Sequence, residues 1–325
     1  MIKMLKILRG VREQTGEVGI EVEVEGPRLD MNDDKYWTVT GDGSLRGNSA
    51  EYVLRDPVPR DEVKEVIDLL MRRHASDLYL VEPSERCGVH IHVNCQELTL
   101  RQTFNFAVLY LAFEDVLMRW CGEDREGNLF CLRTGDASHF IPTFARCIKE
   151  HTVHWMSGDQ FRYASINLGA LEKYGSMEFR GMRTPEDLNV IKTWVDILLR
   201  LKDKSLQYEK PQQIVEAVSI GPGQFITDAL GPYEELVECR DMHQMVVQCI
   251  RRIQPAVYAF DEHSHDNYMR KMEKVLDDPR VRERPPKRGN GYREQREAAL
   301  RQVIAGQQHR AQRMQEPNPF ARGEE

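Results

Sequence analysis

Apolar and charged residues alternate strictly over residues 18–26, VGIEVEVEG. Successive side chains of a strand point to opposite faces, so this alternation predicts a strand with one apolar face and one acidic face. The acidic face carries Glu21, Glu23 and Glu25. Because neighbouring like charges repel one another, we expect a bound cation or arginines from elsewhere to lie over this row. An edge strand with a solvated acidic face is the alternative interpretation.

A second segment, residues 88–94, has the same pattern, with histidines in place of glutamates (GVHIHVN). His90, His92 and Asn94 alternate with the apolar residues, so both imidazoles point to one face of the predicted strand. A single histidine in such a place is most often a core residue whose hydrogen bonds are satisfied. Two histidines at this spacing can serve one site, and the segment therefore predicts a second strand that carries ligands.

Shorter runs of the same kind predict further strands, and apolar stripes at helical spacing predict the helices between them. We expect Asp61 to be the N-cap of one helix and Thr184, followed by Pro185, to begin another. Residues 122–160 lack a regular pattern and are expected to be irregular. The further predicted strands are 36–40, 50–55, 79–81, 162–168 and 177–180, and the predicted helices are 61–74, 99–120, 184–204 and 232–260.

The last third of the chain differs in character from the rest. Gly221-Pro222-Gly223 interrupts the pattern, and the apolar content falls after residue 261. We therefore predict a main domain over 1–220, a helical extension over 221–260 that packs on it, and a charged tail over 261–325. The tail is expected to be helical or partly disordered, with one helix near 292–312.

The composition limits the possible functions. The chain has 325 residues, 45 basic against 52 acidic, and a formal net charge of -7, which argues against a general nucleic-acid binder. No apolar run approaches the roughly 18 residues that span a membrane, and the first residues lack the features of a signal peptide. The seven cysteines are scattered without a C-x-x-C pair, which is typical of reduced thiols. We therefore expect a cytoplasmic protein without a membrane partner.

A third polar group lies in residues 177–180, MEFR, where Glu178 and Arg180 share one face of a predicted strand. A surface ion pair between the two is one interpretation, because such pairs are common and contribute little. Several carboxylates with an imidazole suit a hard divalent cation, Mg²⁺ or Mn²⁺, and possible ligands include Glu51 on another predicted strand. An arginine beside such a metal suits phosphate, so the set suggests phosphoryl transfer from a nucleotide. Neither a P-loop motif nor G-x-G-x-x-G occurs.

The order of these motifs resembles that of the amidoligase family. The matching segments are GIEVE, DGSL with EYVLRDPV, CGVHIHVN, RYASINL and SMEFRGMRTPEDLNVIKTWVDIL, within residues 16–205. Members of this family are carboxylate–amine ligases related in fold to glutamine synthetase and glutamate–cysteine ligase, and many are encoded by bacteriophages. Each motif alone is weak, and it is their order that gives the resemblance its specificity.

The resemblance implies an α+β fold, with a curved antiparallel sheet that is flanked by helices and holds ATP and metal ions on its concave face. By motif, Glu178, Arg180 and Arg162 would be catalytic, with Arg180 holding the transferred phosphate. Glu25 receives no role. The implied metal ligands are Glu21, Glu23, Glu51, His90 and Glu178, and the implied nucleotide- or substrate-binding residues are His92, Asn167, Asp42, Ser44 and Arg180.

The function implied is an ATP- and Mg²⁺-dependent ligase that forms an amide or isopeptide bond through an acyl phosphate. Its partners would be a carboxylate and an amine, as small molecules, peptides or protein side chains, in a host cytoplasm if a phage encodes it. Two alternatives stay open at this point. One is a zinc hydrolase that uses His90 and His92 with a carboxylate. The other is a non-catalytic protein that keeps the ligase fold for binding.

Overall fold

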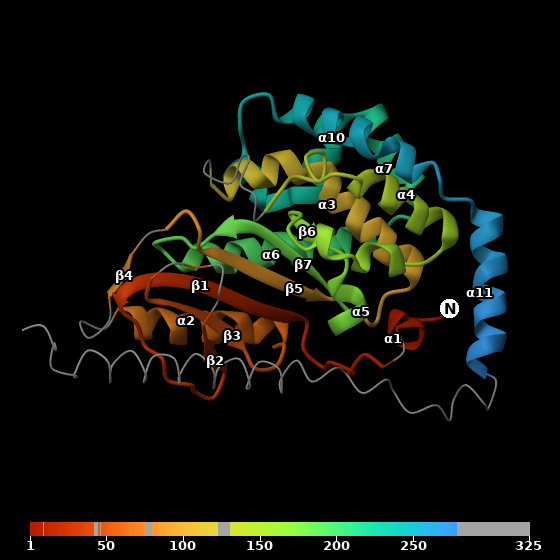
Figure 1. Ribbon diagram of the computed structural model, residues 1–325. Helices are drawn as coiled ribbons and strands as arrows, with labels where there is room; N and C mark the ends of the chain where they lie inside the picture. Colours follow the sequence, from red (N-terminus) through yellow and green to blue (C-terminus); the bar gives the residue numbers. More distant parts are fainter. Residues whose placement is uncertain are drawn as a thin grey trace, which may run out of the picture. The chain divides into compact units, whose positions relative to one another are not determined.

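The computed structural model describes residues 1–8, 10–41, 45, 47–75, 80–82, 84–122 and 131–277. Residues Met1–Pro286 form one compact unit, whereas Lys287–Glu325 form a second unit that lies outside the described residues. The first unit is an α+β fold built on a seven-stranded sheet with helices packed against it (Figure 1). This architecture confirms the predicted class: α+β, with an antiparallel sheet flanked by helices.

The strands of the sheet run in the order β2-β3-β1-β5-β7-β6, and β4 pairs with the end of β1. The pairings described between these seven strands are antiparallel, and an isolated parallel bridge joins Leu132 to Ala164. Each of the seven segments predicted as strands contributes one strand. Their bounds are β1 (Val18–Arg28), β2 (Trp37–Thr40), β3 (Ser49–Leu54), β4 (Leu80–Glu82), β5 (Gly88–Asn94), β6 (Ile166–Asn167) and β7 (Ser176–Arg183).

The helices of the described residues follow and separate these strands. They are α1 (Met4–Ile7), α2 (Val63–His74), α3 (Leu100–Trp120), α4 (Phe140–Glu150), α5 (Ala170–Tyr174), α6 (Asn189–Ser205), α7 (Gln212–Ile220), α8 (Pro222–Leu230), α9 (Glu234–Val237), α10 (Met242–Val257) and α11 (Glu262–Asp277). Short 3-10 turns lie at Arg60–Glu62, His154–Ser157, Asp159–Phe161 and Gly231–Tyr233. Within the described residues, no helix is both long and apolar enough to cross a membrane.

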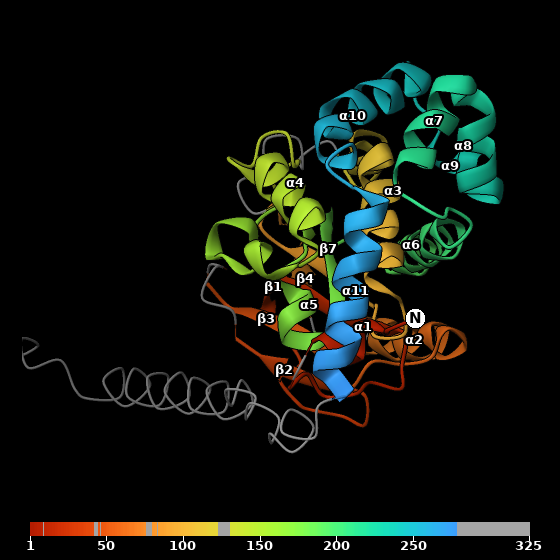
Figure 2. The same cartoon turned by 90° about the vertical axis from the view of Figure 1, so that its right-hand side faces the viewer.

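The apolar face of the sheet packs on α3 and α6, which lie with α2 on one side of the strands (Figures 1 and 2). Ile20 of β1 and Ile91 of β5 are at most 1% exposed. Phe179 of β7 lies with its ring centroid 5.5 Å from that of Phe106 and 4.7 Å from that of Tyr110, both on α3. Burial of one such side chain contributes roughly 1.5–3 kcal/mol. A register shift of one residue would turn charged side chains into this core, so packing on one face sets the position of the other.

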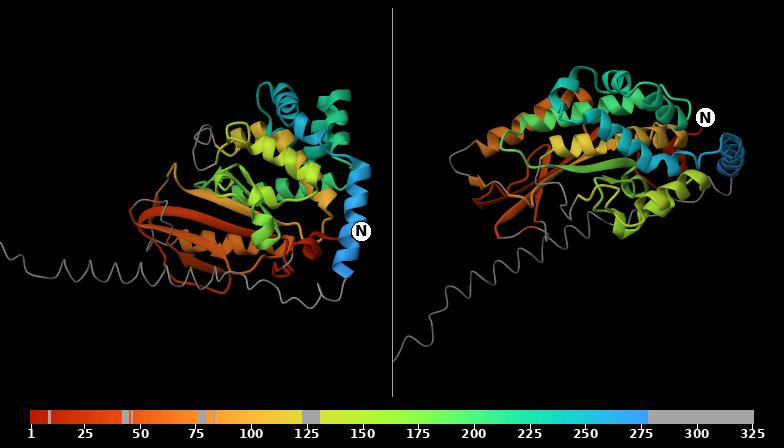
Figure 3. Two further views of the ribbon diagram at one scale, coloured as in Figure 1. Left: turned by 45° about the vertical axis from the view of Figure 1, so that its right-hand side comes forward. Right: turned by 90° about the horizontal axis from the view of Figure 1, so that it is seen from above.

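A further layer of helices covers α3 on the side away from the sheet, where α10 packs on α3 (Figures 1 and 3). Phe113 of α3 stacks on Phe225 of α8, with ring centroids 5.3 Å apart and planes 5° from parallel. The residues of this layer belong to the same hydrophobic core as those of the sheet. The division at residue 220 stays a prediction, and the predicted helix near 292–312 lies outside the described residues.

Helix α3 begins where the sequence predicts. Thr99 is its N-cap, and its side chain accepts a hydrogen bond from the amide of Gln102 while the Gln102 side chain accepts one from the amide of Thr99. This reciprocal capping box satisfies two amides that would otherwise lack a partner in the helix.

Two predicted helix starts are wrong. The Thr184 hydroxyl donates to the carbonyls of Glu23, at 2.6 Å, and Gly88, at 3.2 Å, so it joins two strands, and α6 begins only at Asn189. Asp61 is not an N-cap, because a 3-10 turn over Arg60–Glu62 leads directly into α2. At Thr184, the local cap signal was outweighed by contacts with two strands that the sequence pattern does not contain.

Other departures concern the extent of regular structure. Residues 140–150, expected to be irregular, form α4, whose buried face includes Phe140 and Phe144. The predicted helix 232–260 divides into α9 and α10, and α10 continues through Pro255. The predicted strand 162–168 is reduced to Ile166–Asn167, so Arg162 lies before it. The first part of the predicted charged tail is α11.

Helix α11 contacts the rest of the unit through a cluster of rings. His265 is 3% exposed, and its ring centroid lies 5.1 Å from those of His151 and Phe260. Beside it, Arg101 of α3 donates to Asp266 at 2.8 Å. Burial, together with the positive charge of Arg101 and His151, lowers the pKa of His265 to about 4. The imidazole is therefore neutral in the folded protein at neutral pH.

We predict that His265→Phe reduces the loss of stability on acidification. Between pH 6.5 and about 4, the folded protein binds fewer protons at this site than the unfolded chain. The contribution of His265 to the free energy of unfolding is therefore fully present above this window and falls as the pH is lowered through it. The variant should lose about 2 kcal/mol less unfolding free energy than the wild type between pH 7 and pH 5. Urea unfolding at the two pH values measures this, and equal losses would contradict it.

Candidate functional site

The register of the sheet brings the polar positions of four strands onto one face. Glu23 of β1 lies opposite Glu51 of β3, and Glu21 of β1 lies opposite His90 of β5. On the other side of β5, His92 lies opposite Glu178 of β7. The alternation within each strand then points these side chains away from the α3–α6 core. The face is therefore assembled from residues that lie up to 157 positions apart, from Glu21 to Glu178.

His90 lies at the centre of this group. Its Nδ1 is 3.2 Å from Glu21 Oε2 and 3.8 Å from Glu178 Oε1, and its Nε2 is 3.9 Å from Glu23 Oε1. Among the described residues, two sets of three side chains bring ligand atoms within 4.8 Å of one another. One set is Glu21, His90 and Glu178, and the other is Glu23, Glu51 and His90. We call these the first and second triads; they share His90.

The burial of His90 keeps its imidazole in the form that binds metals. Its side chain is 5% exposed, and burial with the nearby charge of Arg180 lowers its pKa to about 4 although carboxylates surround it. A neutral imidazole has a ring nitrogen free to bind a cation but supplies no positive charge to the glutamates. Two carboxylates about 4.8 Å apart repel by about 3 kcal/mol at an effective dielectric constant of 20. The triads therefore favour a cation.

The pair of Glu178 and Arg180 is part of this group and not a surface ion pair. Burial raises the pKa of the Glu178 carboxyl, but the charge of Arg180 and a hydrogen bond from Asn167 are among the contributions that outweigh it and hold that pKa at about 2. Arg180 Nη1 donates to Glu178 Oε1, and its Nε is buried without a hydrogen-bond partner in the described structure. Glu178 is thus ionised, with a guanidinium fixed beside it.

Hydrogen bonds fix the two carboxylates of the second triad. Glu23 Oε2 accepts from the Gly88 amide at 2.7 Å, and Glu51 Oε2 accepts from the Thr40 hydroxyl at 3.0 Å. Each of these bonds engages Oε2 of the carboxylate, and Oε1 of Glu23 is the oxygen that faces His90. Such partners orient ligand carboxylates and raise their affinity for a metal.

His92 lies beside the first triad, not in it. Its Nδ1 is 3.1 Å from Ser176 Oγ, and its Nε2 is 3.8 Å from Glu21 Oε1. The Tyr174 ring meets it edge-on at 5.5 Å. On β1 the position opposite is Gly19, where a Cβ would lie 3.3 Å from that of His92. These contacts hold the imidazole at the margin of the acidic group.

Asn167 is brought to the group, whereas Arg162 is not. The Asn167 side chain donates to Glu178 Oε2 at 2.7 Å and accepts from the Gly169 amide at 3.0 Å, so its amide is engaged in holding Glu178. Arg162 is exposed and lies over the Tyr163 ring at 4.5 Å, and none of its described contacts is with the triads. Among the described residues, the arginine that reaches the acidic group is Arg180.

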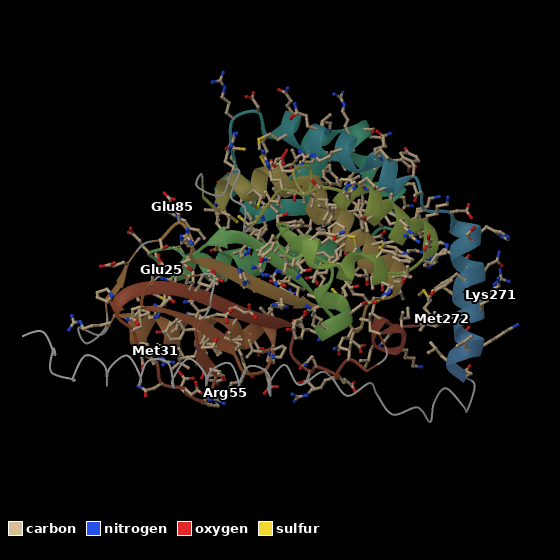
Figure 4. All side chains as sticks on the ribbon, in the orientation of Figure 1. Glu25, Met31, Arg55, Glu85, Lys271 and Met272 are labelled. Atoms are coloured by element: carbon tan, nitrogen blue, oxygen red, sulfur yellow. The ribbon has the colours of Figure 1, made fainter. Side chains whose placement is uncertain are left out.

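Neither triad contains Asp42, Ser44 or Glu25. Asp42 and Ser44 lie outside the described residues. Glu25 is half-buried near the end of β1, opposite Ser49 of β3 and Glu82 of β4, and belongs to neither triad (Figure 4).

Sequence reasoning missed Thr40 and Ser176, which orient Glu51 and His92. Ser176 stands two positions before Glu178, so alternation along β7 could have placed it on the same face. Thr40 reaches Glu51 only through the pairing of β2 with β3, for which the sequence holds no signal.

The donor set fits a hard divalent cation. Its oxygens come from four carboxylates, Glu21, Glu23, Glu51 and Glu178, and they share one imidazole. Oxygen ligands suit Mg²⁺ and Mn²⁺, whereas structural zinc sites use mainly cysteine and histidine. The described residues contribute no cysteine to either triad.

Comparisons with known proteins do not identify the chain. No protein-family model matches it, and no curated protein matches it significantly. Evidence for a function therefore comes from the geometry of the two triads and from the motif order.

We predict that Mn²⁺ raises the melting temperature and that Glu21→Gln or Glu51→Gln weakens this effect. Each variant removes one ligand, from the first or the second triad respectively, and should weaken Mn²⁺ binding about tenfold. The control is Glu25→Gln, which removes the same charge from the same face of β1 but lies outside both triads. Thermal melts over a Mn²⁺ titration measure this. An equal effect of Glu25→Gln would mean that the metal binds only through diffuse negative charge.

Proposed function

We propose that this protein is an ATP- and Mg²⁺-dependent carboxylate–amine ligase of the amidoligase type. The observation that carries the proposal is the pair of triads that share His90, with Arg180 fixed beside Glu178. Metal ligands next to a buried guanidinium are the parts that phosphoryl transfer requires. The motif order over residues 16–205 supports the same reading.

The architecture agrees with this proposal. A glutamine synthetase-like catalytic domain would have an antiparallel sheet with one face on helices and the other open to nucleotide and metal. Here α3 and α6 cover the apolar face, and the triads lie on the opposite face. The seven cysteines are reduced thiols, which supports a reducing compartment such as the cytoplasm of a cell or of a phage host.

The reaction proposed has two steps. A carboxylate oxygen of the first substrate attacks the γ-phosphorus of ATP, ADP leaves, and an acyl phosphate forms. The amine nitrogen of the second substrate then attacks the acyl carbon, phosphate leaves, and the nitrogen gives up a proton as the amide forms. Divalent cations held by the triads would neutralise the charge of the phosphates.

The residues of the chain have separate roles in this scheme. Arg180 would stabilise the charge on the transferred phosphoryl group, which is the main source of catalysis in reactions of this kind. Glu178 would bind metal through Oε1, which faces His90, while Asn167 holds Oε2. His92, held by Ser176 at the margin of the first triad, would lie nearer the phosphates.

A zinc hydrolase is supported less well. It would need His90 and His92 to converge on one ion with a carboxylate. In the described structure both triads contain His90 without His92, whose Nδ1 faces Ser176. A non-catalytic binding protein would not need ATP, and the experiments below separate this alternative from a ligase.

We predict that Glu178→Gln abolishes ATP-dependent activation of carboxylates, with a loss of at least about a hundredfold. Hydroxylamine traps acyl phosphates as hydroxamates, so a pool of amino acids and dicarboxylates with hydroxylamine, ATP and Mg²⁺ tests the first step without knowledge of the amine. Glu25→Gln serves as the control and should keep its activity. Hydroxamate formation by folded Glu178→Gln at the wild-type rate would contradict the site.

We predict that Arg180→Gln separates metal binding from nucleotide binding. Loss of the guanidinium removes a positive charge beside the first triad, so Mn²⁺ affinity should be kept or raised. ATP should bind about tenfold more weakly, because a charge-assisted hydrogen bond to phosphate contributes about 1.5–3 kcal/mol. Calorimetry with Mn²⁺ alone, and then with ATP, measures both constants. Weaker Mn²⁺ binding with unchanged ATP binding would contradict the role given to Arg180.

A further inference from the structure

A buried carboxylate outside the triads lies under the edge of the sheet that carries Asn167. Glu114, on α3, is 1% exposed. It accepts hydrogen bonds from the Thr134 amide at 2.8 Å, the Thr134 hydroxyl at 2.5 Å, the Ser165 hydroxyl, and Arg252 Nη1 at 3.2 Å. Burial raises the pKa of Glu114, and these donors oppose that rise. Four donors from three separate segments converge on one carboxylate.

Ser165 joins this carboxylate to the candidate site. It is fully buried, its amide donates to the Leu132 carbonyl at 2.8 Å, and its carbonyl accepts from the Arg180 amide at 2.8 Å. Two residues further along the chain, Asn167 donates to Glu178 Oε2. Ser165 therefore contacts the backbone of Arg180. It also directly precedes β6, whose Asn167 holds the Glu178 side chain.

Strand β6 forms few ladder hydrogen bonds. β6 consists of Ile166 and Asn167, which within the described part of the chain pair with Phe179 and Glu178 of β7. So short an edge strand has few ladder bonds to hold its position. Backbone bonds to Leu132 and Arg180 hold the preceding residues. The bond from the Ser165 hydroxyl to Glu114 adds a further fixed point, because that carboxylate is rigidly placed in a buried helix.

The outer helical layer takes part in the same network. Arg252 of α10 binds both Glu114 and its neighbour Asp115, the latter at 3.1 and 2.5 Å. Gly135 leaves room for this side chain, since a Cβ there would lie 3.0 Å from Arg252 Cδ. Arg252 thus offsets the charge of Glu114, which would otherwise be costly to bury.

We propose that Glu114 is a positioning residue for the candidate site. It fixes Ser165, so that β6 presents Asn167 to Glu178 and the carbonyl of Ser165 holds the backbone of Arg180. The region 221–260, through Arg252 on α10, thereby supports the site although it lies on the far side of α3 from the sheet (Figure 1). The effect on metal binding rests on the proposed function, whereas the effect on the backbone does not.

Two variants and one matched control test this role in the full chain. Glu114→Gln replaces the carboxylate that accepts these hydrogen bonds with a neutral amide. Ser165→Ala removes the serine hydroxyl that donates to Glu114 and changes the side-chain volume little. Asp115→Asn is the control, because Asp115 binds the same arginine from the same helix and has no described contact with Ser165. Ser165→Ala keeps the test valid if Glu114→Gln does not fold.

The first readout is hydrogen exchange of the Arg180 amide by NMR, in the absence of metal. We expect exchange at least about tenfold faster in Glu114→Gln and Ser165→Ala than in Asp115→Asn, with core amides of α3 unchanged, because the bond to Ser165 loosens. Exchange at the control rate in Ser165→Ala would overturn the proposal.

The second readout is calorimetry with Mn²⁺ alone. We expect binding about tenfold weaker in the two variants than in the control, as is usual when a residue that orients a metal ligand is lost. Equal Mn²⁺ affinity in variants and control would overturn the link to the site. If even the wild type binds no Mn²⁺, the proposed function fails, and the amide readout still decides the positioning role.

Discussion

Repulsion among buried carboxylates is the constraint on which the rest of this structure depends. Glu23 and Glu178 are each 5% exposed, and both have an oxygen within 4 Å of the neutral His90 imidazole. Negative charges in such a place are costly unless cations or hydrogen-bond donors compensate them. The compensation visible in the described residues comes from the Gly88 amide, Asn167 and Arg180. We propose that this incompletely compensated negative charge gives the face an affinity for cations, because perturbed charges of this kind cluster at functional sites.

The apolar half of the sheet makes this arrangement possible. The strands that carry the acids also carry Ile20, Ile91 and Phe179, which are nearly inaccessible to solvent against α3 and α6. Because one face cannot shift without the other, burial of these residues sets the distances between glutamates on separate strands. Glu114 and Arg252 extend the same support to the edge of the sheet, where hydrophobic packing and ladder bonds are scarce.

The sequence predicted those features that depend on neighbours along the chain. Period-two alternation located β1, β5 and β7, and it placed Glu21, Glu23, His90 and Glu178 on polar faces. It could not show that Glu51 lies opposite Glu23 or that Glu114 reaches Ser165, because strand order and long-range hydrogen bonds have no local signal. At Thr184, hydrogen bonds to two strands overrode the local capping preference. At Asp61, a 3-10 turn stands where the cap was predicted.

The most direct test of the account is a crystal structure with Mn²⁺ and a non-hydrolysable ATP analogue, read by anomalous scattering from manganese. The account predicts manganese within about 2.3 Å of a His90 nitrogen and of carboxylate oxygens from at least one triad, with the γ-phosphate in contact with Arg180. Manganese bound elsewhere on the protein, or a nucleotide bound away from the polar face of the sheet, would contradict it.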